Sequence, residues 1–247
     1  MKTTSTIILA SVAGACVAQD GFPITTDRPS FSDGTLIVPK GRWQIEAGYT
    51  QTNTDGSRFE AIGEALLRWH LSERVEFRLS NFGWGRASET DGLLDPSLGI
   101  KLKLHPGVTA KTPDLALILQ STVPAGDRAF RVDRPQPTAK LAFYQATDST
   151  TGFGGNLVVS DLGEDAGRFT QYAASLYLSK TLNPKTSAFV ELYRLMPLSD
   201  GGPDANFADT GLTYLLNPRT QVDFRVGTGF ESKRDGWFFG FGLGYRF

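Results

Sequence analysis

A two-residue alternation of apolar with small or polar side chains recurs along this sequence. It is clearest at the carboxyl terminus, where glycines and one arginine separate the apolar residues Phe239, Phe241, Leu243, Tyr245 and Phe247. Successive side chains of a β-strand point to opposite faces, so this spacing predicts a strand with one apolar face. The run reaches the length of about 9–11 residues that a tilted strand needs to cross a bilayer.

The same alternation marks other segments. Clear runs occupy 43–50, 75–80, 98–104, 172–178 and 222–230, and weaker ones occupy 59–70, 114–124, 136–145, 152–160, 186–195 and 207–216. With the last strand these make twelve, an even number, as single-chain bacterial membrane barrels have. Charges are missing from the apolar faces, as expected where a charge in lipid would cost about 2–4 kcal/mol.

The connections between these runs alternate in length. The tighter ones are Leu71–Arg74, 146–151, Thr181–Lys185 and Asn217–Arg219, with His105–Pro113 as a long exception. The others are mostly longer, namely Thr52–Arg58, Trp84–Asp95, Ala125–Gln136, Asp161–Arg168, Pro197–Asn206 and Glu231–Gly236. Short periplasmic turns and longer external loops are typical of transmembrane barrels. We therefore predict an all-β, up-and-down antiparallel transmembrane β-barrel of about twelve strands.

The amino terminus divides into three parts. Residues 1–18 have a positive Lys2, an apolar stretch and a small-residue end, which predicts a signal peptide. Residues 19–40 show no periodicity and form an N-terminal arm, and residues 41–247 form the barrel. Cys16 is the only cysteine, and in an alternative reading it is the lipid-modified first residue of a lipoprotein.

Composition excludes two classes of protein. After Asp20 no apolar run is long enough for a transmembrane helix. The formal net charge of −1 argues against a nucleic-acid partner, because binding phosphates requires a basic surface.

If the apolar face meets lipid, the other face lines a lumen that contains seven acidic and seven basic residues. These are Glu46, Glu60, Glu64, Arg68, Glu76, Arg78, Lys101, Lys103, Lys140, Glu191, Asp209, Asp223, Arg225 and Arg246. Buried charges must be paired or hydrated, so the lumen is either a structural ion-pair network or a water-filled channel. Twelve strands lie between filled small barrels and open porins, and the arm 19–40 is long enough to enter the lumen.

The sequence gives little support for an enzymatic function. The two histidines, His70 and His105, fall near the predicted periplasmic end, where a hydrolase acting on surface substrates would not need them. The sequence has no G-x-S-x-G elbow and no zinc-binding motif, so we assign no catalytic residue, metal or cofactor. The acidic stretch 200–204 lacks EF-hand spacing and is read as a solvated loop.

Several motifs resemble a known family. They include Thr26-Asp27-Arg28-Pro29-Ser30-Phe31 in the arm, then the stretches 38–49, 66–69, 71–78, 95–101, 124–127, 188–193, 209–216 and 242–247. Together they resemble the proteins grouped as "putative MetA-pathway of phenol degradation". The resemblance covers nearly the whole mature chain and implies an outer-membrane barrel often described as a transporter. The link to phenol or other aromatic compounds comes with the family name and not from these residues.

These observations favour a passive outer-membrane transporter or channel for small molecules, with hydrophobic or aromatic compounds as one substrate class. The alternative is a structural or surface-binding barrel with a closed, ion-paired lumen, and a minor one is an outer-membrane hydrolase. The expected location is the outer membrane of a Gram-negative bacterium, after export directed by the signal peptide. Outer-membrane lipids are the expected surroundings. The expected protein partner is the barrel-assembly machinery, which would recognise the last strand with Phe239, Phe241, Leu243, Tyr245 and Phe247.

Overall fold

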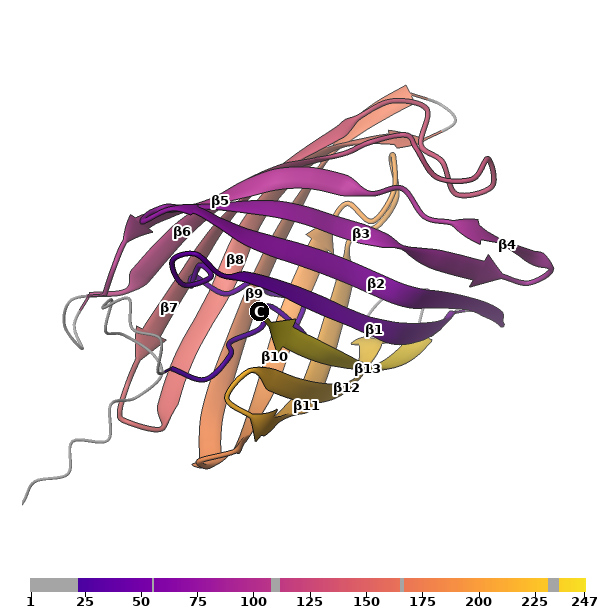
Figure 1. Cartoon of the computed structure of the whole chain (residues 1–247). Coiled ribbons are helices and arrows are strands. Elements are labelled where there is room, and N and C mark those ends of the chain that lie inside the picture. The colour runs from indigo at the N-terminus through magenta and orange to yellow at the C-terminus, as the bar shows by residue number, and fades with distance from the viewer. Residues whose placement is uncertain (1–21, 55, 108–111, 165–166, 231–235) are drawn as a thin grey trace, which may run out of the picture.

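The chain forms a closed antiparallel β-barrel in a computed structural model (Figure 1). The structure describes residues 22–54, 56–107, 112–164, 167–230 and 236–247. The predicted signal peptide 1–18 and the first residues of the arm lie outside this range. Within it, no helix is long and apolar enough to cross a membrane.

Thirteen strands occur in the described residues, and twelve of them form the barrel wall. They are β1 (Trp43–Thr54), β2 (Ser57–Ser72), β3 (Val75–Ala87), β4 (Thr90–Leu93), β5 (Ser97–His105), β6 (Asp114–Thr122), β7 (Gln136–Ala146), β8 (Thr151–Glu164), β9 (Gly167–Asn183), β10 (Thr186–Met196), β11 (Ala205–Asn217), β12 (Thr220–Phe230) and β13 (Gly236–Arg246). Neighbours in sequence pair with each other around the wall, and β1 closes it by pairing with β13. The predicted up-and-down barrel of twelve strands is confirmed.

The extra strand β4 extends a hairpin with β3 beyond the barrel wall (Figure 1). Sequence analysis placed these residues in the external loop 84–95, because four residues are too few to show a periodicity. The loop after β6 covers the base of this hairpin. There Asp95 accepts hydrogen bonds from the backbone N–H groups of Ala125 at 2.9 Å, Gly126 at 2.7 Å and Val132 at 2.6 Å. One carboxylate therefore joins two of the sequence motifs that we singled out, at 95–101 and 124–127.

Two external connections are shorter than predicted. β1 continues to Thr54 and β2 begins at Ser57, while β8 continues to Glu164 and β9 begins at Gly167. The predicted loops Thr52–Arg58 and Asp161–Arg168 are thus mostly strand. Polar residues at these strand ends broke the alternation in the sequence, but the backbone pairing continues through them.

The apolar faces of the strands point away from the barrel interior. Phe224 and Phe241 form a cross-strand pair and remain 46% and 52% exposed, as residues that meet lipid should be. At the periplasmic rim, Trp43 and Phe247 stack with ring centroids 3.9 Å apart, and Trp43 pairs with the exposed Trp69. Aromatic residues at the rim are typical of girdles at the membrane interface.

Candidate functional site: the lumen and its N-terminal arm

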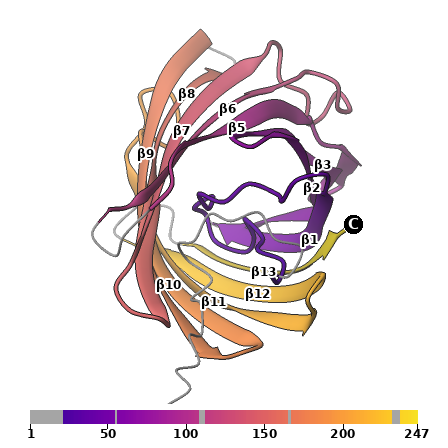
Figure 2. The ribbon, with the colours of Figure 1, turned by 60° about the vertical axis from the view of Figure 1, so that its left-hand side comes forward.

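The N-terminal arm, Phe22–Lys40, runs inside the barrel (Figure 2). Acidic side chains of the wall accept its backbone N–H groups. Glu46 of β1 accepts from Asp27 at 2.9 Å and from Arg28 at 3.1 Å, and Glu76 of β3 accepts from Val38 at 2.8 Å. On the opposite wall, Glu191 of β10 accepts from Phe31 at 2.7 Å and from Ser32 at 3.0 Å. The arm is therefore attached to both sides of the lumen.

Asp27, in the arm motif, is the centre of a buried cationic cluster. Its carboxylate lies 2.5 Å from the guanidinium of Arg78, 2.7 Å from Nζ of Lys101 and 3.7 Å from Arg68. A second arm residue, Asp33, lies 2.7 Å from Arg78 and 2.6 Å from Nζ of Lys140. Two arm carboxylates thus neutralise cations from four different strands.

Arg68 of β2 connects the arm to the wall. Its guanidinium lies 3.0 Å from both Glu46 and Glu76, and it donates to the carbonyl oxygens of Leu36 at 2.7 Å and Thr25 at 3.2 Å. The side chain is almost completely buried. A buried charge is tolerated when its partners are this close and its donors are satisfied. The network therefore favours one position of the arm.

Arg28 turns toward the other side of the lumen. It lies 3.4 Å from Glu64 and 3.6 Å from Asp223. Its guanidinium occupies space that a Cβ atom at Gly48 or Gly242 would take. Glycine at these two wall positions thus allows the arm to approach the backbone closely.

The remaining predicted lumen residues are distributed around this network. Arg225 donates to Thr50 at 3.3 Å and lies over the ring of Phe238, and Asp209 is the cross-strand partner of Glu191. Arg246 donates to the carbonyl oxygen of Phe22 at the start of the arm, and Lys103 of β5 is buried opposite Ala116.

Glu60 does not belong to the lumen, contrary to the sequence analysis. It pairs with Gln51, which pairs with the outward-facing Phe239, and it accepts a hydrogen bond from Tyr49 at 2.5 Å. The reason is the register shift between Ile62 and Ala65, where Glu64 has a φ of 21°. A bulge of this kind exchanges the two faces of a strand, so residues on either side of it no longer follow one parity.

The sequence analysis also missed neutral residues that hold the arm. Asn156 of β8 accepts from the backbone of Asp33 at 2.8 Å and donates to its carbonyl oxygen at 3.0 Å. Ser175 of β9 is hydrogen-bonded to Ser32 at 2.6 Å. Both side chains are uncharged, so a list of charged residues on the polar face does not include them, although Asn156 shares the even-numbered positions of 152–160 with Ser160.

The charges around the arm change the acidity of its carboxyl groups. Burial alone would raise the pKa of Asp27, but the charges of Arg68, Lys101 and Arg78 outweigh it and hold the pKa well below 3.8. Burial likewise opposes ionisation of Asp33, yet Lys140 and Arg78 lower its pKa. A carboxyl group whose pKa is lower in the docked state than in the free arm stabilises docking. The stabilisation is complete at a pH above the ordinary pKa of the group, and it is lost as the pH falls through the lowered pKa.

We therefore expect the ion pairs of Asp27 and Asp33 to hold their part of the arm from pH 7 down to about pH 4 and to weaken only in stronger acid. A nitroxide label on a Ser30→Cys variant would report this in electron paramagnetic resonance spectra. The label should remain immobile across that range and become mobile only below it. A label that becomes mobile between pH 7 and pH 5 would show that the ion pairs of Asp27 and Asp33 do not hold this part of the arm.

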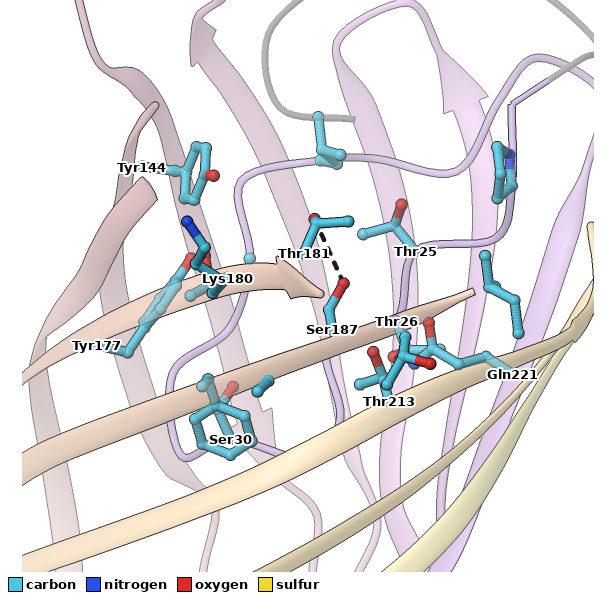
Figure 3. Close-up of a pocket in the computed structure, with 18 of the residues that line it drawn as sticks. Thr25, Thr26, Ser30, Tyr144, Tyr177, Lys180, Thr181, Ser187, Thr213 and Gln221 are labelled. Atoms are coloured by element: carbon cyan, nitrogen blue, oxygen red, sulfur yellow. Dashed lines mark hydrogen bonds between the residues drawn. The ribbon is translucent and has the colours of Figure 1, made fainter. Parts of the chain in front are cut away.

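The arm leaves part of the lumen empty. A cavity of about 290 Å³ lies between the arm and the wall formed by β7 to β12 (Figure 3). The turns 148–151 and 183–186 contribute to its lining, so it lies at the periplasmic end of the barrel. The lumen thus holds both a closed ionic network and a space large enough for a small molecule.

The family model described as "Putative MetA-pathway of phenol degradation" matches residues 26–247. The chain belongs to this family. The match begins at Thr26, within the arm motif that carries Asp27, so the segment inside the lumen is part of the family pattern. A search of curated proteins gives no match.

Solved structures with the same fold are outer-membrane proteins. An outer-membrane channel from Pseudomonas putida F1 superposes with a TM-score of 0.63 at 17% identity, covering 85% of this chain and 97% of that chain. The KdgM porin has a TM-score of 0.54 at 10% identity, covering 81% and 98%. The NanC porin has a TM-score of 0.54 at 8% identity, covering 82% and 98%. These neighbours, channels and porins by name, share the barrel architecture with this member of the phenol-degradation family.

Proposed function

We propose that this protein is an outer-membrane channel through which small molecules pass passively, with hydrophobic or aromatic compounds as a substrate class. The observation that carries the proposal is the cavity of about 290 Å³ left between the arm and the wall. A barrel that served only as a structural element would not need to keep such a space. The channel and porin neighbours and the family membership support the same function.

In this proposal the arm limits the size of the pore. Deleting residues 22–40 should raise the conductance of the refolded barrel in planar bilayers several-fold, because the deletion removes the segment that crosses the lumen. Liposome swelling with sugars of increasing size should show a matching rise in the size limit. If neither the full-length nor the deleted barrel passes any solute, the channel proposal fails.

A structural barrel with a closed lumen is the second candidate, and the buried network around Arg68 and Asp27 favours it. The two candidates differ in the expected effect of Arg68→Ala. A channel held closed by the network should become more permeable when Arg68 is lost. A purely structural barrel should lose stability while its permeability stays at zero.

We further propose the cellular setting. The exposed apolar band, with residues such as Phe224 and Phe241, would lie in the outer-membrane lipids after signal-peptide-directed export. The last strand, β13, would be recognised by the barrel-assembly machinery through its outward-facing residues and the terminal Phe247. Adding residues after Phe247 should then reduce assembly into the membrane, which a protease-protection assay on cells would measure.

A further inference from the structure

Two neighbouring tyrosine rings lie on one side of the periplasmic cavity. Tyr144 of β7 and Tyr177 of β9 are both register partners of Gly154 on β8, the strand that separates them. Their ring centroids lie 6.4 Å apart and their planes differ by 25°. Both rings line the cavity of about 290 Å³.

Glycines on β8 make this arrangement possible. A Cβ atom at Gly154 would lie 2.7 Å from the hydroxyl oxygen of Tyr177, and one at Gly152 would lie 2.5 Å from Cζ of Tyr144. The hydroxyl ends of both tyrosines therefore lie against glycine backbone, in space that the side chain of any other residue would fill. Because both tyrosines rest on the wall in this way and also line the cavity, they present aromatic surface to its interior.

Hydroxyl and amide groups surround the remaining sides of the cavity (Figure 3). Ser187 of β10 donates to Thr181 of β9 at 3.5 Å, and Gln221 of β12 donates to Thr26 of the arm at 2.5 Å. Thr213 of β11 lines the same space. Hydroxyl groups can donate and accept, so this rim can match hydrogen-bonding groups of either kind.

Three of the ionised groups that line the cavity, Asp27, Lys180 and Asp148, have partners of their own. Asp27 is held by Arg78 and Lys101, and Nζ of Lys180 donates to the hydroxyl of Thr151 at 3.0 Å. Asp148 accepts from the backbone N–H groups of Thr150 at 2.7 Å and Thr151 at 2.9 Å. A charged solute would have to compete with these contacts, whereas a neutral one would not.

We propose that this cavity binds a small, neutral, ring-shaped solute that carries hydroxyl groups, with the ring over Tyr144 and Tyr177. The hydroxyl groups of the solute would bond to the serine and threonine side chains of the rim. The volume suits a single ring with its substituents, since ligand pockets for drug-sized molecules begin at about 300 Å³. The site rests on the proposed channel function, in which it is the periplasmic binding site of the permeating solute. Two chemistries fit this description, a phenolic ring and a monosaccharide.

Saturation-transfer NMR on the refolded barrel in detergent micelles tests the site, with hydroquinone and methyl β-glucoside as separate probes. We expect saturable binding of at least one probe. Tyr177→Leu and Tyr144→Leu should each weaken it about tenfold, because aromatic contact is lost. Tyr177→Phe should retain most of the binding, since the ring remains. Tyr172→Leu is the matched control, because Tyr172 of β9 is 56% exposed on the outer face of the barrel and does not line this cavity.

A second type of variant is independent of the tyrosines. Ser187→Leu places a larger side chain in the cavity and should abolish binding in a barrel that still folds, as judged by its resistance to unfolding in sodium dodecyl sulfate. The probe that binds identifies the chemistry as phenolic or saccharide. If neither probe binds saturably, or if Ser187→Leu and Tyr177→Leu bind as tightly as the natural sequence, the proposed site is wrong.

Permeation measured in parallel separates the two proposals, because a barrel that conducts but binds neither probe overturns only the site. A barrel that binds but never conducts overturns only the channel.

Discussion

We expect the Asp27→Ala variant to loosen the N-terminal arm and widen the lumen. Asp27 contacts Arg78, Lys101 and Arg68, and these cations come from three different strands. Without it, Lys101 keeps only the carbonyl oxygen of Leu36 as a hydrogen-bond acceptor among the described contacts. Removing one partner from a buried ion pair typically costs about 3–5 kcal/mol, because an uncompensated charge stays in the interior.

Planar-bilayer conductance of the refolded variant would measure this loosening. The conductance should rise above that of the natural protein and stay below that of the barrel lacking residues 22–40, because the arm keeps its contacts with Glu191, Asn156 and Tyr193. Asp204→Ala is a matched control, because Asp204 pairs with Arg194 at 2.6 Å in an exposed position. Exposed pairs contribute about 0–1 kcal/mol, so the control should behave like the natural protein. Equal conductance of Asp27→Ala and the natural protein would show that the arm does not depend on this carboxylate.

The second large effect is expected on the lipid-facing surface. Phe224 lies near the middle of β12, 46% exposed, between the outward-facing Phe241 and Leu212 of its neighbours. The Phe224→Arg variant should lower the free energy of unfolding by about 2–4 kcal/mol, the cost of an arginine near the bilayer midplane. Denaturant titration of the barrel in lipid bilayers, followed by tryptophan fluorescence, would measure the change.

The same substitution at a different depth in the bilayer provides the control. Leu182 is also exposed, at 56%, but lies beside the periplasmic turn between β9 and β10. Arginine there should cost only about 0–1 kcal/mol, since the penalty falls toward the interface. Equal effects at Phe224 and Leu182 would contradict a bilayer around the barrel. A water-exposed surface would tolerate both substitutions.

Aromatic stacking also attaches the arm to the wall. Phe31 stacks on Tyr193, which stacks on Phe207, at centroid distances of 4.2 Å and 4.8 Å. The arm is therefore held by aromatic packing on the β10–β11 side and by ion pairs on the β2–β5 side. Asp27→Ala would weaken the ionic attachment and leave the stacking on Tyr193, so the arm should move toward β10 and β11.

The alternation of apolar and polar residues was sufficient to predict the barrel. Positions such as Phe224, Phe241 and Phe239 lie where their spacing placed them, because the direction of a side chain on a strand is a local property of the backbone. The even number of strands and the long antiparallel runs followed from the same local rule. The arm was recognised as a separate segment for the opposite reason, since it has no period.

Only the closed barrel determines which charged side chains contact each other. Asp27 and Lys101 are 74 residues apart in sequence, and their distance of 2.7 Å depends on how the strands are staggered around the wall. The bulge near Glu64 placed Glu60 on the outer face, and a single shifted residue of this kind leaves no clear trace in the period of the sequence. Local spacing therefore determined the strands and their faces, whereas contacts across the lumen required the curvature and register of the whole barrel.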